Sequence, residues 1–498
     1  MMKIRIFLLS YAFCLCYPGL GQQMSYGNRC AVEYQKIRNL EYTGWESGES
    51  NRTLVVDSLR DFRPKRIRLT RWGGRRDLKE PSVVIGSPGY FRLGRFDGRW
   101  YFIDPDGGCL VLMGTQSLGD CAGMPGERRW SRGTARLLRE NGFNYANFGA
   151  FTLKHYSDVM APGCGERILD SGGRKLAYID LAYMLRSFVW DTEIDRLKLN
   201  RLIAVFHPDY LDHLDRYARE NCAKFRNDKH CIGYYIDNEL GFIGWRKYFA
   251  DQTILLRNFL GMTDARNPTP LPESCAYAKE AALEFLRRRG VAPEAITEED
   301  EEAFRAYVAD YYFRTASEAL RRYDPNHLIL GSRLHGFPKY DEITVRACAR
   351  YCDAISVNYY GVWTPEEEYM RDLESWSEGK PFFVTEFYVK GEDAARNGIP
   401  YENKEGGGWL VRTQADRGRY YQNFTLHLLR ARNCVGWVHF KYRDAIYNSK
   451  SGEEAYCNKG IVSVDCEPYA DFLKAMKQVH VNAYALIDYF DRGPSVSK

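Results

Sequence analysis

The sequence lacks the motifs that mark several large enzyme classes. It has no HExxH pair, no Walker-type phosphate loop, no GxSxG elbow and no GxGxxG after an early strand. Metalloprotease, nucleotide-binding and serine-hydrolase functions are therefore without support. The fourteen cysteines include no CxxC pair, and Cys348 and Cys352 stand one helical turn apart, which favours packing on one helix face over a metal site. We expect no metal and no cofactor.

A strong net charge and long apolar runs are missing as well. A formal charge of +5 over 498 residues is too small to indicate a nucleic-acid partner. Residues 1–21 have the three-part form of a secretory signal, with two basic residues, an apolar run at 6–17 and small residues ending at Gly21. That run is too short to span a membrane. We expect an exported protein, periplasmic or secreted, cleaved near Gly21, with lipid attachment at Cys14 or Cys16 as the less favoured alternative.

The length of the chain suits a single large barrel. A (β/α)8 barrel takes about 250 residues, and often more than about 400 with insertions. The chain is 45% hydrophobic, which is enough for a large core. Before the barrel, YFRLGRFDGRWYFIDPDGG alternates apolar and polar positions around turn signals and predicts a hairpin. We expect a signal peptide at 1–21, a β-rich extension and hairpin at 22–107, and a catalytic barrel at 108–498.

From residue 109 onward, short apolar runs alternate with helical segments. Such alternation indicates parallel strands joined by helices, and eight runs suggest a closed barrel. The predicted fold class is α/β, a (β/α)8 TIM barrel with a short β-rich N-terminal lead-in. The expected strands are 109–114, 143–148, 176–183, 232–237, 327–332, 353–358, 382–387 and 434–440, and the expected helices include 210–225, 298–323 and 417–432.

Two of these runs lead directly into a glutamate. Glu239 follows IGYYIDN and Glu386 follows PFFVT, so both would lie at the carboxyl ends of strands, where such barrels place their active sites. Retaining glycosidases use two carboxyl groups about 5–5.5 Å apart, one protonated to donate to the leaving oxygen and one ionised to attack the sugar. Either glutamate alone could be a surface charge beyond a buried strand. Together, with Asn238 directly before the first, they predict a glycosidase pair.

The sequence resembles the clan A retaining glycoside hydrolases, which are built on TIM barrels. Asn-Glu follows the fourth expected strand, Glu follows the seventh, and a tryptophan lies in the eighth. More narrowly, the chain resembles glycoside hydrolase family 50, the β-agarase group, and agarase-like proteins. The stretches that carry the resemblance are GRWYFIDPDGG, LMGTQSLG, GFNYANFG, FHPDYLDHLDRYA, CIGYYIDNELGF, VTEFY, GGGWLVRTQADRGRYYQNF, CVGWVHFKYRD and NKGIVSVDCEPY.

This resemblance implies roles for four residues around the scissile bond. Glu239 would be the general acid and then the general base, and Glu386 would be the nucleophile that forms a covalent glycosyl ester. Asn238 would hydrogen-bond the 2-hydroxyl of the sugar being cleaved, and its alternative role is a turn residue at the strand end. Tyr360 would hold the nucleophile ionised. Tyr359 is its rival, because a one-residue error in the strand end exchanges their faces.

Further candidates would line the cleft. Trp437 would form the floor against which the sugar ring stacks, although a tryptophan inside a strand is more often core. Arg333 and His335, after the fifth strand, would contact sugar hydroxyls, and Gln116 and Asn147, after the first and second strands, would add polar lining. A purely structural role is the alternative for each of them.

The chain departs from the family pattern before the barrel. Family 50 proteins usually carry a substantial β-rich module there, whereas about seventy residues separate the leader from the hairpin in this chain. The proline-containing segment 262–297 could narrow the cleft and favour attack at chain ends. The expected partner is an oligo- or polysaccharide of the galactan or agarose type. Alternatives are another β-linked glycan, cleaved in the manner of an exo-acting β-galactosidase or β-glucosidase, or a non-catalytic glycan-binding barrel, which the presence of both carboxylates disfavours. The oligomeric state is not fixed by the sequence.

Overall fold

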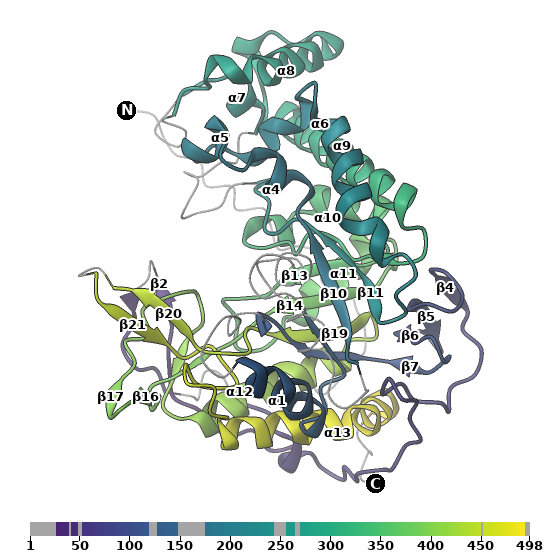
Figure 1. Cartoon of the computed structure of the whole chain (residues 1–498), viewed down its shortest axis with the longest axis vertical. Helices are drawn as coiled ribbons and strands as arrows, with labels where there is room; N and C mark the ends of the chain where they lie inside the picture. Colours follow the sequence, from purple (N-terminus) through teal and green to yellow (C-terminus); the bar gives the residue numbers. More distant parts are fainter. Residues whose placement is uncertain are drawn as a thin grey trace, which may run out of the picture.

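Eight parallel strands form a ring at the centre of the protein, as shown by a computed structural model (Figure 1). Neighbours pair in chain order, and β19 returns to β8, with Gly436 opposite Leu112. A parallel bridge between Leu334, beyond β12, and Val357 of β13 closes the last gap. The predicted (β/α)8 barrel is therefore confirmed. Its strands are β8 (Leu112–Thr115), β9 (Tyr145–Asn147), β10 (Ala177–Ala182), β11 (Cys231–Ile236), β12 (Leu328–Ile329), β13 (Ile355–Asn358), β14 (Phe382–Glu386) and β19 (Cys434–His439).

The structure describes residues 26–38, 41–47, 52–118, 127–147, 175–243, 255–263, 269–449 and 452–493. The predicted signal peptide, 1–21, lies outside the described residues. Within these ranges, no helix is both long enough and apolar enough to cross a membrane.

Helices cover the outside of the ring and extend beyond it. The longest is α9 (Glu298–Tyr323), where the Thr297 hydroxyl accepts a bond from the Asp300 backbone N–H and the Asp300 carboxylate accepts one from the Thr297 N–H. Figure 1 shows α4 to α8 as a helical lobe above the barrel. The other α-helices in the described residues are α1 (Glu127–Glu140), α4 (Met184–Val189), α5 (Glu193–Arg196), α6 (Tyr210–Tyr217), α7 (Leu255–Phe259), α8 (Ala276–Arg289), α10 (Glu342–Tyr351), α11 (Glu367–Trp376), α12 (Gln414–Arg430) and α13 (Ala470–Arg492).

An antiparallel sheet plugs the amino end of the ring. Its strands are β4 (Val83–Ile85), β5 (Arg92–Phe96), β6 (Arg99–Ile103) and β7 (Cys109–Leu110), paired in that order. Phe102 packs edge-on against Phe383 of β14, with 6.2 Å between ring centroids. The first barrel strand begins at Leu112, later than the expected residue 109, because Cys109 pairs with Ile103 in this sheet.

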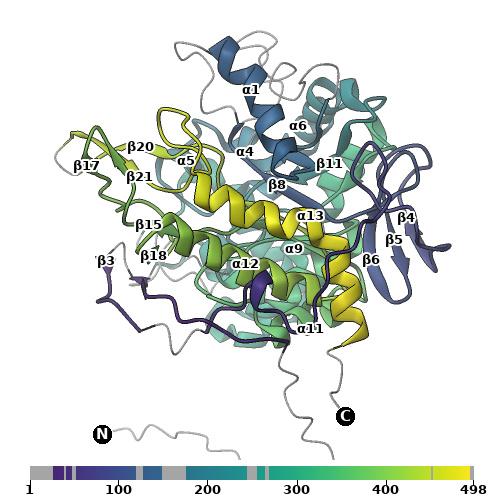
Figure 2. The ribbon, with the colours of Figure 1, turned by 90° about the horizontal axis from the view of Figure 1, so that it is seen from below.

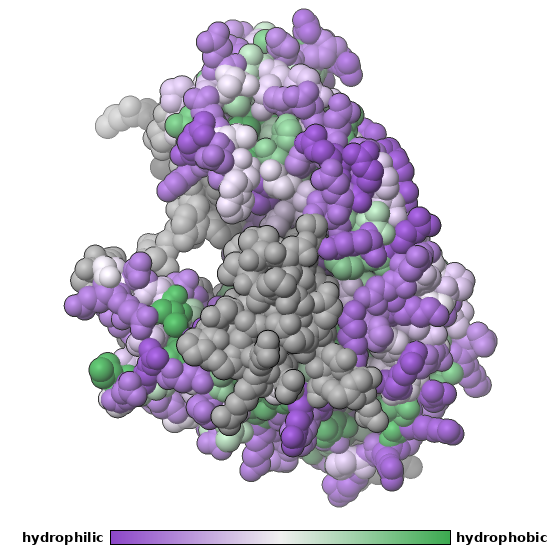
Figure 3. Space-filling model, viewed as in Figure 1, coloured by the Kyte–Doolittle hydropathy of each residue, from purple (hydrophilic) through white to green (hydrophobic). Residues whose placement is uncertain are grey.

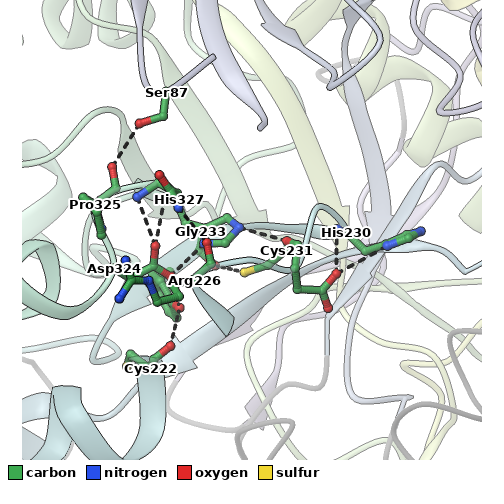
Figure 4. Close-up of polar contacts among 12 residues, drawn as sticks. Ser87, Cys222, Arg226, His230, Cys231, Gly233, Asp324, Pro325 and His327 are labelled. Carbon is green, nitrogen blue, oxygen red and sulfur yellow. Dashed lines mark hydrogen bonds and ion pairs between the residues drawn. The ribbon is translucent and has the colours of Figure 1, made fainter. Parts of the chain in front are cut away.

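A buried polar cluster fixes the same end of β11 and β12 (Figure 4). The Nδ1 atom of His327 lies 2.7 Å from Oδ2 of Asp324, and its Nε2 lies 2.9 Å from the Asp228 carbonyl oxygen. The hydroxyl of Tyr234 donates to the same Asp324 oxygen at 2.6 Å. Both ring nitrogens of His327 are therefore used in hydrogen bonds that hold this part of the barrel together. The carboxyl ends of the strands lie at the opposite end of the ring.

The described N-terminal residues run beneath the barrel along α12 and α13 (Figure 2). There β1 (Tyr34–Gln35) pairs with β18 (Leu410–Val411), which in turn pairs with β15 (Lys390–Gly391). In the space-filling view, the outline is hollowed between the helical lobe and the lobe that carries β20 and β21 (Figure 3). The remaining strands are β2 (Ile37–Arg38), β3 (Glu41–Tyr42), β16 (Ala395–Arg396), β17 (Ile399–Pro400), β20 (Ala445–Asn448) and β21 (Glu454–Cys457).

Candidate active site

Two carboxylates meet at the carboxyl end of the ring. Glu386 is the last residue of β14, and Glu239 lies three residues beyond β11. Asn358, at the end of β13, is paired in register with Glu386, and its Nδ2 donates to Oε1 of Glu239 at 2.7 Å. The hydroxyl of Thr385 fixes this amide by donating to its Oδ1 at 2.7 Å. Asn358 thus links the two glutamates that the sequence singled out.

Glu386 is held by three donors. Gln116, which follows β8, donates through Nε2 to Oε1 of Glu386 at 2.9 Å, and the hydroxyl of Tyr360 donates to Oε2 at 2.6 Å. The guanidinium of Arg333 binds Oε1 as an ion pair, and its side chain is only 2% exposed. Hydrogen bonds and an adjacent positive charge stabilise the ionised form of a carboxyl group. The surroundings of Glu386 therefore suit a carboxylate that must carry charge.

The two glutamates differ in the groups that counteract the rise in pKa caused by their burial. Burial raises the pKa of Glu386, the charge of Arg333 opposes this most strongly, and the nearby Glu239 raises the pKa further. Burial also raises the pKa of Glu239, and the bond from Asn358 is the largest opposing effect. Three donors reach Glu386, and Asn358 supplies the one hydrogen bond that lowers the pKa of Glu239. Glu239 is therefore the group better suited to keep a proton.

The turn that presents Glu239 is supported from below by Asp237. Asp237 and Glu239 both adopt left-handed backbone conformations, with φ of 55° and 54°. The carboxylate of Asp237 accepts the backbone N–H groups of Leu185 and Arg186, each at 2.8 Å, and the hydroxyl of Tyr312 at 2.7 Å. It thereby joins β11 to the first turn of α4 and to α9. These bonds hold the turn in a left-handed conformation, which costs free energy for residues other than glycine. The sequence analysis did not find this residue, because its partners lie far apart in the chain.

Asn238 and His335 lie beside Glu239. Oδ1 of Asn238 is buried and accepts no hydrogen bond from the residues that the structure describes. Nδ1 of His335 lies 3.7 Å from Oε1 of Glu239, and its ring packs edge-on against Tyr360. Burial lowers the pKa of His335 to about 4, so the ring is neutral at ordinary pH. Polar groups of both side chains therefore lie beside Glu239.

Two curated proteins are similar in sequence to this chain. No protein-family model matches it. Beta-agarase B of Vibrio sp. (strain JT0107) is 22% identical over 479 residues, which is 80% of this chain and 48% of that protein. Beta-agarase A of the same strain is 24% identical over 399 residues, which is 71% of this chain and 36% of that protein. The chain thus spans about half the length of the first relative and less of the second.

Solved structures share the fold over most of its length. The crystal structure of BpGH50 is 27% identical, has a TM-score of 0.73, and the match covers 96% of this chain and 98% of that one. The chain is a β-agarase-like protein similar to glycoside hydrolase family 50. The agarase AgWH50C shares the fold, with a TM-score of 0.61, 18% identity and coverage of 85% of this chain and 67% of its own.

Between the two candidate tyrosines, Tyr360 reaches the carboxylate pair. Its hydroxyl contacts Glu386, whereas the hydroxyl of Tyr359 donates to Glu366 at 2.9 Å. Tyr359 belongs to the hydrophobic core outside the ring. The alternation of side chains along β13 and the residues that follow it therefore separates the neighbouring tyrosines.

The expectation that Trp437 forms the sugar floor needs correction. Its side chain is fully buried in the core outside the ring, and its indole N–H donates to the hydroxyl of Tyr421 on α12 at 2.7 Å. The strand faces outward at this position, while Val438 points inward. Phe440, directly after β19, is half-buried, and its ring centroid lies 5.6 Å from that of Tyr388. The aromatic group at the end of β19 that neighbours the site is therefore Phe440.

Asn147 contacts a tyrosine in the inner layer of the ring. It ends β9, is 2% exposed, and borders the phenol of Tyr235 inside the ring, where burial raises the pKa of that phenol and Asn147 is among the groups that lower it. Tyr235 in turn lies under the guanidinium of Arg333, 5.4 Å from ring centroid to Cζ. Asn147 therefore supports the layer beneath the carboxylates.

Proposed function

We propose that the chain is a retaining glycoside hydrolase that cleaves β-glycosidic bonds in oligo- or polysaccharides of the galactan or agarose type. The unequal set of donors on the two glutamates is the observation that carries this proposal. Glu386, which accepts hydrogen bonds from three donors, is the ionised nucleophile. Glu239, whose pKa is raised by burial and lowered by a single hydrogen bond, from Asn358, is the acid.

The reaction would proceed by double displacement. A carboxylate oxygen of Glu386 attacks the anomeric carbon while Glu239 gives its proton to the departing glycosidic oxygen. Glu239, now ionised, then takes a proton from water, and the hydroxide oxygen displaces Glu386 from the same carbon. Two inversions give a product with the original β configuration. Asn238 would bind the 2-hydroxyl of the sugar, and Tyr360 would keep Glu386 oriented.

The choice of substrate rests on similarity to other proteins. Two curated relatives are named β-agarases, and AgWH50C is described as an agarase. Because the two curated relatives resemble most of this chain in sequence, a galactan backbone is the first substrate to test. The leader-like residues 1–21 support export, which would bring the enzyme to glycans outside the cytoplasm.

A panel of aryl β-glycosides and galactan oligosaccharides tests the proposal, with the product anomer followed by NMR. Wild-type protein should release β product first, and Glu239→Ala and Glu386→Ala should both lose activity. Azide should rescue Glu386→Ala by occupying the space of the lost carboxylate. Glu299→Ala, at a glutamate whose side chain is 86% exposed on α9, is the matched control. Activity that survives in both site variants would contradict the proposal.

A further inference from the structure

Tyr388 is a buried neighbour of the tyrosine that binds Glu386. It lies two residues beyond β14, is 3% exposed, and packs its ring edge-on against that of Tyr360, with 5.5 Å between ring centroids. The ring of His335 also packs edge-on against Tyr360 at 5.5 Å, but the His335 side chain is 21% exposed. Tyr388 is therefore the more deeply buried of these two rings.

Glycines line one side of Tyr388. The stretch GGGWLV begins with Gly406, Gly407 and Gly408, to which the proposed function gives no role. A Cβ atom at position 408 would lie 2.6 Å from Cδ2 and 2.9 Å from Cζ of Tyr388, and one at position 406 would overlap the tyrosine hydroxyl. Carbon atoms pack at about 3.5–4.0 Å, so neither position has room for a side chain. A Cβ atom at the exposed position 407 would meet no atom of the described residues within 4 Å.

Lys390 holds the glycine loop against Tyr388. Its side chain is fully buried, and its ammonium group donates to the carbonyl oxygens of Asn403 and Gly406 at 2.9 and 3.2 Å. Its backbone N–H donates to the carbonyl of Trp409 at 2.8 Å. Both ends of the loop are thus tied to the residue two positions beyond Tyr388. The loop cannot move away from the tyrosine ring without breaking buried hydrogen bonds, which costs free energy.

We propose that Tyr388 is a positioning residue for the nucleophile: Gly408 seats its ring, and the ring keeps the hydroxyl of Tyr360 on Glu386. The inference rests on the proposed function and adds a supporting layer to the same site. Edge-on aromatic pairs have a preferred geometry, so a displaced ring changes the position at which its partner is most stable. The bond from the Tyr360 hydroxyl to Oε2 of Glu386, 2.6 Å long, depends on that position, because hydrogen bonds weaken as length and angle depart from their optimum.

Alanine substitutions at two adjacent glycines test the inference. The methyl group added in Gly408→Ala displaces the ring of Tyr388, so we expect kcat to fall about tenfold with KM nearly unchanged, the pattern for a contact used in the transition state. Gly407→Ala is the matched control, because its methyl group has room, and it should leave both constants unchanged. A folded Gly408→Ala variant with the kcat of the wild type overturns the inference.

Substitutions of Tyr388 itself form a second, independent test. Tyr388→Phe keeps the ring and should retain nearly all of kcat, whereas Tyr388→Leu removes the ring and should lower kcat about tenfold. Gly408→Ala should then add little to Tyr388→Leu, because the ring that it displaces is gone. Equal kcat values for the phenylalanine and leucine variants, or fully additive losses in the double variant, contradict the inference. The two Tyr388 variants decide the question if Gly408→Ala does not fold.

The pKa of Glu386 is a readout that a general loss of structure would not move in the same way. Burial raises this pKa, the charge of Arg333 lowers it, and the hydrogen bond from Tyr360 lowers it as well. A displaced Tyr360 should therefore raise the pKa of Glu386 by up to about one unit. A 13C NMR titration of labelled glutamate measures it in a Glu239→Gln background, which removes the neighbouring carboxyl group. Tyr360→Phe should give the full rise, and Gly408→Ala should add nothing to it.

The NMR titration also separates this inference from the proposed function, because it needs no turnover. A raised pKa of Glu386 in Gly408→Ala, with no hydrolysis of any glycan by the wild type, would contradict the enzyme function and keep the positioning role of Tyr388. Hydrolysis by the wild type, with neither kcat nor this pKa altered in Gly408→Ala, would do the reverse.

Discussion

The side-chain amide of Asn358 donates to Oε1 of Glu239 at 2.7 Å. This bond stabilises the ionised form, and after burial it has the largest effect on the pKa of Glu239. In Asn358→Ala the pKa of Glu239 should therefore rise, and the basic limb of the kcat/KM profile should move up by about one pH unit. A pH–rate profile measures the shift, with Asn326→Ala at the opposite end of the ring as the control. An unmoved basic limb would show that Asn358 does not set the proton affinity of Glu239.

Tyr360 and Tyr359 form a matched pair for testing the site. Tyr360→Phe removes a donor from Glu386, so we expect kcat to fall by about 10- to 100-fold with little change in stability. Tyr359→Phe removes a buried bond to Glu366 in the outer core, so it should cost about 1 kcal/mol in the free energy of unfolding and leave kcat nearly unchanged. Steady-state kinetics and urea unfolding of both variants check this. The reverse pattern would mean that the two neighbours are assigned to the wrong faces.

Asp237 should make stability depend on pH. Burial raises the pKa of Asp237 to about 6, above its ordinary 3.8. A carboxyl whose pKa is raised by folding stabilises the protein fully when it is protonated, below about pH 4, and that contribution is lost as the pH rises through about 6. Relative to Asp237→Asn, the wild type should lose roughly 3 kcal/mol of unfolding free energy across this range.

Urea unfolding of the two proteins at several pH values measures that loss. Glu239 and Glu386 titrate in both proteins, so the difference between the proteins isolates Asp237. A difference that stays constant with pH would contradict the expected shift.

Substitutions at Trp437 and Phe440 should affect stability and steady-state kinetics differently. Trp437→Phe leaves a cavity and an unpaired Tyr421 hydroxyl in the outer core, so we expect a loss of about 1–3 kcal/mol in unfolding free energy with an unchanged KM. Phe440→Ala should raise KM or lower kcat with a smaller loss of stability, because its half-buried ring packs against Tyr388, which in turn packs against Tyr360. Thermal unfolding and kinetics on one oligosaccharide distinguish them. A raised KM in Trp437→Phe would return that residue to the site.

The sequence was enough to predict the ring and its two glutamates because both depend on local patterns. Each strand is a short apolar run, and Glu239 and Glu386 come directly after two of them. Trp437 was placed on the wrong face because CVGWVHF is apolar throughout and carries no alternation that fixes which side is inward. Val435 and Val438 both turn inward, so a simple two-residue period does not hold across Gly436.

Apart from Tyr360, which the family resemblance placed beside Glu386, the partners of the carboxylates could not be predicted from the sequence. Gln116 and Glu386 are 270 positions apart, and Asn358 and Glu239 are 119 apart. Such pairs come together only when the register of every intervening strand is set. Gln116 and Arg333 were proposed as sugar contacts, and in the structure they first hold the carboxylate of Glu386.

The bridge between Leu334 and Val357 joins the two ends of the sheet, and Arg333, which pairs with Glu386, is its immediate neighbour. Barrel closure and assembly of the carboxylate site are consequently one structural event. A chain that has formed every strand but left this junction open lacks the register that places Arg333 beside Glu386. Separation of β12 from β13 would therefore move the guanidinium of Arg333 away from the carboxylate that it neutralises.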